Sequence, residues 1–554
     1  MNRKHFIKIS GGSLAAFMLN YKANSKTPFY QLALPDEVWI QSDDKWYSLK
    51  SSGSSKYIFE DIEVILEHKN EVLSVFINSH VKPLSAVKLK WKYSFSFNNK
   101  ILGDAWERTY GDDSWQSINP EKKMPWYFIQ HDANDTNCFG VKTGCNSLCY
   151  WNVETDNMQL TLDTHSAGVG VRLGSRTLHA ADIITTKNKP GETLFTTSQR
   201  FCKMMCDKPR LPAQPVYGIN DWYFTYGNNS SDLILKITSL LTGLAPNTNN
   251  RPFSVIDAGW AFYSPLLPND CCWQDDYSRP NDKFKDMHKL AGDIEKLGMR
   301  PGLWTRPLCA SYNTNANLLL PLIPGREDPK KPVLDPSIEE NIEHVKKNIS
   351  LYHQWGYKMV KHDFTTFDIA GRWGFEMKEN FTSGGWKFYD HGRTTAEIIL
   401  HLYTSIREAA KDMYLIGCNT LSHLSAGLFE LNRIGDDTSG KEWDRTRKMG
   451  VNTLAFRSIQ HKNFYFADAD CVGLTDSIPW DKNKQWMQLL AESSTPLFIS
   501  AQPDALGTEQ KEFIKKSFDT ASRILPVCEP LDWMQTNIPS EWKLNGRIIN
   551  FDWG

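Results

Sequence analysis

The amino-acid sequence predicts an α/β protein: a (β/α)8 TIM barrel, preceded by an N-terminal β-sandwich and followed by a short C-terminal β-element. Two observations predict this architecture. Between about residue 28 and residue 208, apolar and polar residues alternate over short segments, as they do in half-buried strands. From Tyr217 onward, short strand-like runs alternate with helical stretches, a pattern typical of βα units.

The chain begins with a segment typical of an export signal, predicted to cover residues 1–26. Arg3, Lys4 and Lys8 precede a short apolar run from Ile9 to Leu19, which is too short to span a bilayer. The basic start resembles the bacterial twin-arginine motif, with Lys in place of the second Arg. We therefore expect an exported protein, periplasmic or extracellular, with no membrane insertion after signal removal.

Residues 27–208 are predicted to form the β-sandwich. Alternating patterns occur in Tyr57 to Leu66, in Val72 to Ile77 and in Val87 to Tyr93, and Asn, Gly and Asp turns separate the short strands. Ser198 to Pro215 ends in a Pro-rich run and is predicted to be a linker.

Residues 209–520 are predicted to form the barrel, because eight βα units over about 290 residues match its usual size. Helical patterns separate most of the strand-like runs, as in Ile338 to Gln354 and Thr394 to Ala410. Residues 521–554 predict a small β-element or the start of a truncated β-domain. The eight runs are Tyr217 to Phe224, Phe253 to Trp260, Arg300 to Trp304, Tyr357 to Phe364, Met413 to Cys418, Leu428 to Ile434, Asn463 to Asp468 and Pro496 to Ser500.

The composition narrows the class of ligand. The net charge is −1, with 63 basic and 64 acidic residues, so nothing favours nucleic acid as a partner. The 20 tryptophans suit a carbohydrate-binding protein, because sugar faces stack on aromatic rings, although large β-rich cores also use Trp. The 11 cysteines are scattered without zinc-site spacing, and we expect no metal and no cofactor.

Two of the strand-like runs end in carboxylates that suit glycoside hydrolysis, which requires a pair of them. Asp363 lies at the end of the fourth run, two residues after Lys361, so both point to the same side of a strand. A Lys ammonium beside Asp363 would keep its carboxylate ionised. Arg433, Asp436 and Asp437 end the sixth run, and paired acids can keep one of them protonated. A simple ion pair and a helix N-cap are the alternative explanations.

Taken together, these motifs resemble the α-galactosidase clan of glycoside hydrolases. Family 36, with its melibiase and raffinose-synthase-like branches, is the most similar, and family 27 is more distant. The motifs that carry the resemblance are Trp222, Asp257-x-Gly-Trp260, Lys361-x-Asp363 and Arg433-x-x-Asp436, with similar short segments at Glu107 to Asp112, Leu334 to Ser337, Phe466 to Asp470 and Thr495 to Ser500.

The resemblance implies a role for each matching position. Asp363 looks like the catalytic nucleophile and Asp436 like the acid/base, with Asp437 as the alternative acid. The substrate-binding residues that it implies are Trp222, Asp257, Trp260, Trp304, Lys361, Cys418, Asn419, Arg433 and Asp470.

One position departs from the family. The second strand of its members usually ends Asp-Asp-Gly-Trp, whereas Ala258 stands at the second of these positions here. A missing charged hydrogen bond to a sugar hydroxyl would cost roughly 1.5–3 kcal/mol in binding. Two explanations are open: the glycone is not plain galactose, or another acid binds the sugar hydroxyl in place of the missing one. The candidate acids are Asp275, Asp276 and Asp470. The insertion Phe367 to His391 is a further candidate for rebuilding the pocket.

The sequence thus predicts a retaining exo-glycoside hydrolase that releases terminal α-galactosyl or closely related residues from oligo- or polysaccharides by double displacement. Three alternatives remain open at this point. A sugar acceptor in place of water would make the protein a transglycosylase of the raffinose-synthase-like type. The glycone would otherwise be α-N-acetylgalactosamine or β-L-arabinopyranose. A non-catalytic carbohydrate-binding protein is the third alternative, against which the intact carboxylate motifs argue.

Overall fold

The computed structural model describes residues 32–133, 135–266, 270–377, 381–382 and 384–554. The predicted export signal, residues 1–26, lies outside these residues. Within the described ranges, none of the helices has the length and apolar character needed to cross a membrane. All 11 cysteines fall inside the described ranges, and all of them are free thiols.

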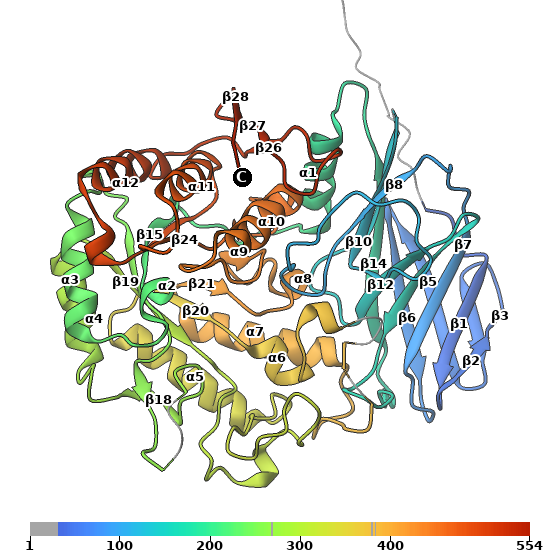
Figure 1. Cartoon of the computed structure of the whole chain (residues 1–554). Coiled ribbons are helices and arrows are strands. Elements are labelled where there is room, and N and C mark those ends of the chain that lie inside the picture. Colours follow the sequence, from blue (N-terminus) through green and yellow to red (C-terminus); the bar gives the residue numbers. More distant parts are fainter. Residues whose placement is uncertain (1–31, 134, 267–269, 378–380, 383) are drawn as a thin grey trace, which may run out of the picture.

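The N-terminal half consists of two antiparallel sheets, drawn in blue to teal (Figure 1). The first sheet has the order β2 (Lys45–Ser48), β1 (Glu37–Ser42), β7 (Ala86–Lys92), β13 (Asn157–Asp163), β12 (Leu148–Val153) and β9 (Met124–Pro125). The second has the order β3 (Lys50–Ser51), β4 (Lys56–Phe59), β5 (Ile62–Lys69), β6 (Val72–Ser79), β14 (Leu178–Lys187), β11 (Asp135–Val141), β10 (Tyr127–Asp132) and β8 (Lys100–Gly103).

Alternating burial explains these sheets, and two local predictions were wrong. In β6 every second residue is buried, because one face of the strand packs on the core. Tyr57 to Leu66 is the hairpin β4–β5 instead of one strand, because Glu60 adopts a positive φ of 54° and begins a turn there. The predicted linker Ser198 to Pro215 begins inside helix α1 (Leu194–Met205), which Thr193 and Thr196 cap reciprocally.

The C-terminal half contains a curled parallel sheet of nine strands. Each of the eight predicted strand-like runs overlaps one of its strands. In sheet order these are β23 (Phe466–Asp468), β22 (Leu431–Arg433), β21 (Tyr414–Gly417), β20 (Met359–His362), β19 (Arg300–Thr305), β16 (Phe253–Ile256), β15 (Tyr217–Asn220), β25 (Leu497–Ala501) and β24 (Cys471–Leu474).

The seventh run supplies one outer strand of this sheet, β23, and the other outer strand, β24, follows that run in the chain. β23 pairs with β22, and β24 pairs with β25, while only Ala469 and Asp470 separate β23 from β24. Asp470 has a positive φ of 73°, so the chain turns sharply at that point. The covalent chain therefore joins the two ends of the hydrogen-bonded sheet, as expected where a parallel sheet curls toward a barrel.

Helices lie around the parallel sheet, and their ends follow local sequence signals (Figure 1). Thr394 and Glu397 form a capping box at the start of the helix predicted over Thr394 to Ala410. The helix predicted over Ile338 to Gln354 is also present, with Glu339 and Glu340 in its first turn. The helices with their bounds are α2 (Trp222–Thr225), α3 (Ser231–Thr242), α4 (Met287–Lys296), α5 (Glu339–Gln354), α6 (Thr365–Ala370), α7 (Thr395–Ala410), α8 (Ser422–Ser425), α9 (Trp443–Thr446), α10 (Thr453–Arg457), α11 (Trp480–Glu492) and α12 (Thr508–Ala521).

Three further antiparallel strands complete the described chain at its C-terminal end. They are β26 (Glu529–Pro530), β27 (Glu541–Leu544) and β28 (Arg547–Asn550). A two-stranded sheet, β17 (Ala261–Phe262) and β18 (Asp276–Pro280), follows β16. The C-terminal strands lie over the α11–α12 side of the parallel sheet (Figure 1).

Buried polar contacts join the sandwich to the parallel sheet's layer of helices. Arg457 pairs with Asp104 at 2.9 Å, and both side chains are buried. Gln460 donates to the Tyr127 hydroxyl at 2.8 Å. The loop between β8 and β9 extends over the C-terminal half (Figure 1). This loop carries the Thr109 backbone N–H to the Ile434 carbonyl, 2.9 Å away, and so reaches the end of β22.

Candidate active site

A cavity of about 340 Å³ lies at the carboxyl ends of the parallel strands. Catalytic groups of (β/α)8 enzymes occupy this end of the sheet, because the βα loops converge there. The described residues that line the cavity are Arg108, Tyr110, Trp222, Asp257, Ala258, Cys272, Trp304, Lys361, Asp363, Phe364, Trp373, Phe375, Asp436, Asp437 and Arg445. Seven of the predicted site residues are therefore brought together by the fold.

Asp363 follows β20 directly and is held at both carboxylate oxygens. The Trp304 indole N–H donates to Oδ2 at 3.0 Å, and the backbone N–H of Phe364 donates to Oδ1 at 2.8 Å. Phe364 has a positive φ of 65°, a conformation that residues other than glycine seldom adopt. The sharp turn at Phe364 aims the carboxylate into the cavity, where strain of this kind is often found.

Lys361 pairs with Asp257 rather than with Asp363, which corrects the predicted contact. Its Nζ lies 2.7 Å from Asp257 Oδ2, and both side chains are buried. Burial opposes the charged ammonium, but the nearby acidic groups, with the Asp257 carboxylate foremost, together raise the pKa of Lys361. Asn220 also donates to Asp257 Oδ2 at 2.7 Å. This pair forms a charged wall of the cavity beside Asp363, which lies in the same lining.

Asp436 is held by two arginines from different parts of the chain. Arg108 Nη2 lies 2.7 Å from its Oδ1, and Arg445 Nη2 lies 2.7 Å from its Oδ2. The Asp436 N–H donates to the Thr109 carbonyl at 2.9 Å, so the loop between β8 and β9 also fixes the backbone. Arg108 is buried, whereas the Arg445 side chain is 39% exposed.

Asp437 faces the same cavity with a different environment. Its Oδ1 lies 3.2 Å from Arg433 Nη2 and 3.8 Å from Arg108 Nη1. Burial opposes its charge, but the surrounding cations, with Arg433 and Arg108 foremost, together lower the pKa of Asp437 to about 2. Asp437 is therefore ionised at neutral pH in the free protein, and this makes it a poor proton donor.

Two predicted site residues, Arg433 and Asp470, lie behind the cavity instead of lining it. They pair at 3.0 Å and are both buried. Thr438 donates to the same Asp470 oxygen through its backbone N–H at 2.8 Å, and the Tyr223 hydroxyl donates to it as well. Arg433 thus reaches the site through Asp437, and Asp470 fixes Arg433 in place.

Trp260 and Cys418 also lie outside the cavity lining. Trp260 is fully buried among other aromatic rings, and its indole N–H donates to the Trp304 carbonyl at 2.8 Å. It therefore supports Trp304, which lines the cavity. The Cys418 thiol lies between two guanidinium groups, 3.6 Å from Arg433 and 3.8 Å from Arg108. Both residues act on the site through their neighbours.

Asn419 joins the sandwich to the barrel and does not line the cavity. Its side-chain amide donates to the buried carboxylate of Glu107, which also accepts from the Tyr110 hydroxyl. The Gly374 N–H donates to Glu107 at 2.7 Å. Burial raises the pKa of Glu107 to about 6. Glu107 therefore holds Tyr110 and the segment that follows β20 against each other.

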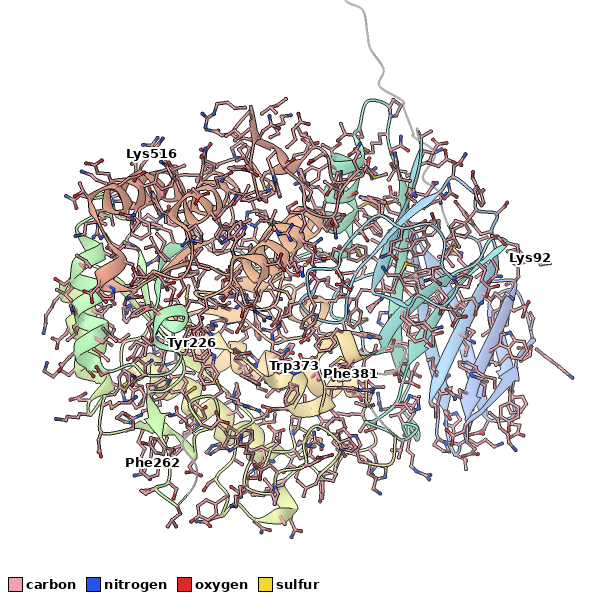
Figure 2. The ribbon with its side chains drawn as sticks, viewed as in Figure 1. Lys92, Tyr226, Phe262, Trp373, Phe381 and Lys516 are labelled. Carbon is pink, nitrogen blue, oxygen red and sulfur yellow. The ribbon has the colours of Figure 1, made fainter. Side chains whose placement is uncertain are left out.

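Several lining residues were not predicted. Arg108 and Tyr110 lie in Glu107 to Asp112, a segment that resembles the family but carried no predicted role. The long stretch of sequence between Arg108 and Asp436 gives no sign that the two side chains pair. Trp373 and Phe375 come from the insertion Phe367 to His391, so the expectation that it contributes to the pocket is confirmed. Figure 2 shows Trp373 and Phe381 on the side of the barrel that faces the sandwich. The other missed lining residues are Cys272, Phe364 and Arg445.

Ala258 lines the cavity, and none of the three proposed replacement acids does. Asp275 and Asp276 line a separate cavity of about 520 Å³, near Phe262 and α5. Asp470 is committed to Arg433. None of the three acids therefore lines the cavity beside Ala258, and the side chain at this position of the wall is apolar.

Solved structures share this fold. An α-galactosidase of Thermus thermophilus, in complex with p-nitrophenyl α-D-galactopyranoside, aligns with a TM-score of 0.60 and 15% identity over 93% of this chain and 98% of that one. A family 36 α-galactosidase of Geobacillus stearothermophilus, in complex with raffinose, aligns with a TM-score of 0.61 and 13% identity over 91% and 78%. The fold is thus that of the family 36 α-galactosidases.

The same fold extends to other glycosidases. A family 31 sulfoquinovosidase of E. rectale aligns with a TM-score of 0.58 and 12% identity over 93% of this chain and 87% of that one. No protein-family model matches the sequence. The shared fold is therefore compatible with more than one sugar, and the choice of glycone depends on the residues of the cavity.

Proposed function

We propose that this protein is a retaining exo-glycoside hydrolase that releases terminal α-galactosyl or closely related residues. The observation that carries the proposal is the cavity at the carboxyl ends of the parallel strands, which is lined by Asp363 and by Asp436. The fold shared with α-galactosidases supports the same chemistry. Retaining hydrolysis needs one carboxylate to attack and another to transfer a proton.

In the proposed mechanism, Asp363 attacks the anomeric carbon and Asp436 protonates the departing oxygen. The glycosyl ester on Asp363 is then hydrolysed by water, from which Asp436 removes a proton. The contacts of Asp363 suit an attacking group, because Trp304 and the Phe364 N–H fix its direction. Arg445, which is partly exposed, would move aside when a substrate oxygen approaches Asp436.

The glycone is proposed from the lining of the cavity. The apolar Ala258 and the rings of Trp373 and Phe375 favour a galactose-like sugar with a less polar face or a bulkier substituent. β-L-Arabinopyranose lacks the 6-carbon, and α-N-acetylgalactosamine carries an apolar methyl group. Both therefore stand beside α-galactose as candidate glycones, and a sugar in place of water as acceptor would make the enzyme a transglycosylase.

The test is a panel of aryl α-galactoside, α-N-acetylgalactosaminide and β-L-arabinopyranoside substrates, with and without an excess of sugar acceptor. We expect turnover of at least one of them. For that substrate, Asp363→Gly with added azide should yield the glycosyl azide of inverted anomeric configuration, because azide then replaces the carboxylate. Sugar binding without turnover on the whole panel would contradict an enzymatic function and support a carbohydrate-binding protein.

A further inference from the structure

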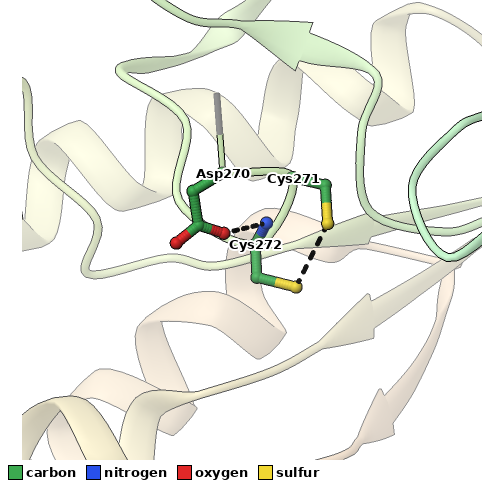
Figure 3. A group of neighbouring side chains, drawn as sticks. All are labelled: Asp270, Cys271 and Cys272. Carbon is green, nitrogen blue, oxygen red and sulfur yellow. Dashed lines mark hydrogen bonds between the residues drawn. The ribbon is translucent and has the colours of Figure 1, made fainter. Parts of the chain in front are cut away.

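The loop between β17 and β18 carries two adjacent thiols that the proposed mechanism does not use. Cys271 and Cys272 are partly exposed, whereas the other nine cysteines are buried. Their Sγ atoms lie 3.7 Å apart (Figure 3). Asp270 lies beside them, and its oxygens are occupied by Lys331 at 2.6 Å and by the Cys272 N–H at 3.0 Å. The occupied carboxylate favours thiol chemistry over metal binding at this site.

The two thiols differ in reactivity. The hydrogen bond from Cys272 lowers the pKa of Cys271, and the same hydrogen bond raises the pKa of Cys272. Because the thiolate is the nucleophile in thiol–disulfide exchange, Cys271 is the attacking group of the pair. Cys272 then lies within reach to complete a second exchange step.

Contacts connect this pair to the cavity. Cys272 lines the cavity, and its carbonyl accepts from Arg306 Nη1 at 2.9 Å. The Arg306 guanidinium lies 4.0 Å from the centre of the Phe364 ring. Phe364 in turn donates its N–H to Asp363. A shift of the Cys272 peptide would therefore be transmitted to the Asp363 carboxylate through Arg306 and Phe364.

We propose that Cys271 and Cys272 form a redox modification site, which a low-molecular-weight disulfide such as oxidised glutathione converts into a vicinal disulfide. The Cys271 thiolate attacks one sulfur of the small disulfide and releases one thiol. Cys272 then attacks Cys271 Sγ in the mixed disulfide and releases the second thiol, which carries away the remaining proton. Cys271 and Cys272 are oxidised by two electrons in total, and the small disulfide accepts these electrons and is reduced to two thiols.

The modification should be reversible. Adjacent Cα atoms lie about 3.8 Å apart across a trans peptide, which is less than the usual span of about 4.4–6.8 Å in disulfides. Strained disulfides are more easily reduced, so the bond forms under oxidising conditions and opens in a reducing medium. Bringing the sulfurs together would pull the Cys272 peptide away from Asp270 and Arg306, and would disturb the wall of the cavity.

The experiment incubates the full chain with oxidised glutathione, and then measures intact mass, non-reducing peptide maps and turnover. We expect the loss of two hydrogen atoms in the peptide that contains Cys271 and Cys272, with at least a tenfold loss of kcat/KM that dithiothreitol restores. Cys271→Ser should keep its activity under the same conditions. Cys145→Ser is the matched control and should respond like the wild type, because its hydroxyl can keep the bond to the Ser147 carbonyl.

Two outcomes would overturn the inference. One is a mass map without the vicinal disulfide, and the other is equal inactivation of Cys271→Ser and wild type. A disulfide that forms without any change in turnover would remove the connection to the cavity. The effect on turnover rests on the proposed function, whereas the mass readout does not. Failure of every glycoside as a substrate with the disulfide present would therefore count against the function alone.

Discussion

The two carboxylates of the candidate site are held in contrasting ways. Asp363 takes its hydrogen bonds from Trp304 in the neighbouring strand β19 and from the next residue in the chain. Asp436 takes its ion pairs from Arg108, which lies between two strands of the sandwich, and from Arg445 of α9. Neighbouring strands therefore build the Asp363 side, while two halves of the molecule must meet to build the Asp436 side.

The Asp363 side of the site depends on pairing within one sheet, whereas the Asp436 side depends on contact between the two halves of the molecule. Parallel pairing of β19 with β20 places Trp304 against Asp363 whenever the sheet forms. In contrast, Arg108 lies next to Thr109, which donates its backbone N–H to the Ile434 carbonyl and accepts from the Asp436 N–H, so docking of this loop places Arg108 beside Asp436. The sandwich is thus part of the site, since it supplies the buried charge that orients one of the two acids.

The largest expected effect removes the Asp363 side of this comparison. Asp363→Asn keeps the shape of the side chain but removes the attacking charge, so kcat/KM should fall by about 10⁴-fold or more. Turnover of the best substrate in the aryl glycoside panel measures the change. The circular dichroism spectrum should stay that of the wild type. Retention of full activity would remove Asp363 from the mechanism.

The next effect tests which acid serves the other side. Asp436→Asn should lower kcat/KM by about 10²–10⁴-fold, as expected for loss of a general acid. The loss should be small for an activated aryl leaving group and large for a natural sugar leaving group. Asp437→Asn is the matched variant on the next residue. A larger leaving-group dependence in Asp437→Asn than in Asp436→Asn would exchange their roles.

Stability should separate the two arginines that hold Asp436. Arg108→Met leaves part of a buried ion-pair network without its partner and should cost about 3–5 kcal/mol in the free energy of unfolding. Arg445→Met removes a guanidinium that is 39% exposed, and should cost about 0–1 kcal/mol because water screens the pair. Urea unfolding measures both values. Equal losses of unfolding free energy in the two variants would mean that Arg108 stabilises the fold no more than Arg445 does.

A smaller effect sharpens the description of the Asp363 side. Trp304→Phe removes the indole N–H that binds Oδ2, and losing a hydrogen bond to a charged group costs roughly 1.5–3 kcal/mol. We therefore expect kcat to fall by roughly 10–100-fold. Trp222→Phe changes another indole of the lining and leaves the contacts of Asp363 in place, so it should act mainly on KM. The reverse pattern would mean that Trp304 binds sugar instead.

The smallest effect concerns the loss of folding stability at acidic pH. It involves two buried histidines, His362 in β20 and His423 at the contact with the sandwich. Burial lowers the pKa of His362, beside Lys361, to about 3, and that of His423, against the sandwich, to about 4. The unfolded chain takes up a proton near pH 6.5 and the folded chain does not. Stability is therefore present above pH 6.5 and falls as the pH drops toward these values.

His362→Leu should flatten this dependence. Each neutral buried histidine contributes a slope of at most about 1.4 kcal/mol per pH unit between those limits. Unfolding free energies of the variant and of the wild type, measured from pH 7 to pH 5, give the two slopes. Identical slopes would show that His362 takes up its proton in the folded chain over this range.

Local patterns predicted much of this molecule. Alternation in β6 and the eight runs of the parallel sheet were visible because apolar periodicity follows from burial of one or both faces of a strand. The capping box of Thr394 and Glu397 marked the start of α7. The hairpin turn at Glu60 was missed because a positive φ at a residue other than glycine has no clear sequence signal. Helix α1 was missed because its Thr193–Thr196 cap is a weak signal beside the Pro-rich run that follows it.

The candidate site likewise has features that the sequence predicted and features that it did not predict. The sequence predicted Asp363, Asp436 and Asp437 as candidate carboxylates, because they lie at the ends of strand-like runs and the strands of one parallel sheet end at the same edge. The packing of distant segments, which the sequence does not show, pairs Lys361 with Asp257, brings Arg108 to Asp436, and leaves Asp275, Asp276 and Asp470 outside the cavity lining. The physical reason is that strand periodicity is a local property, whereas charge pairing depends on which distant segments the packed core brings within a few ångströms.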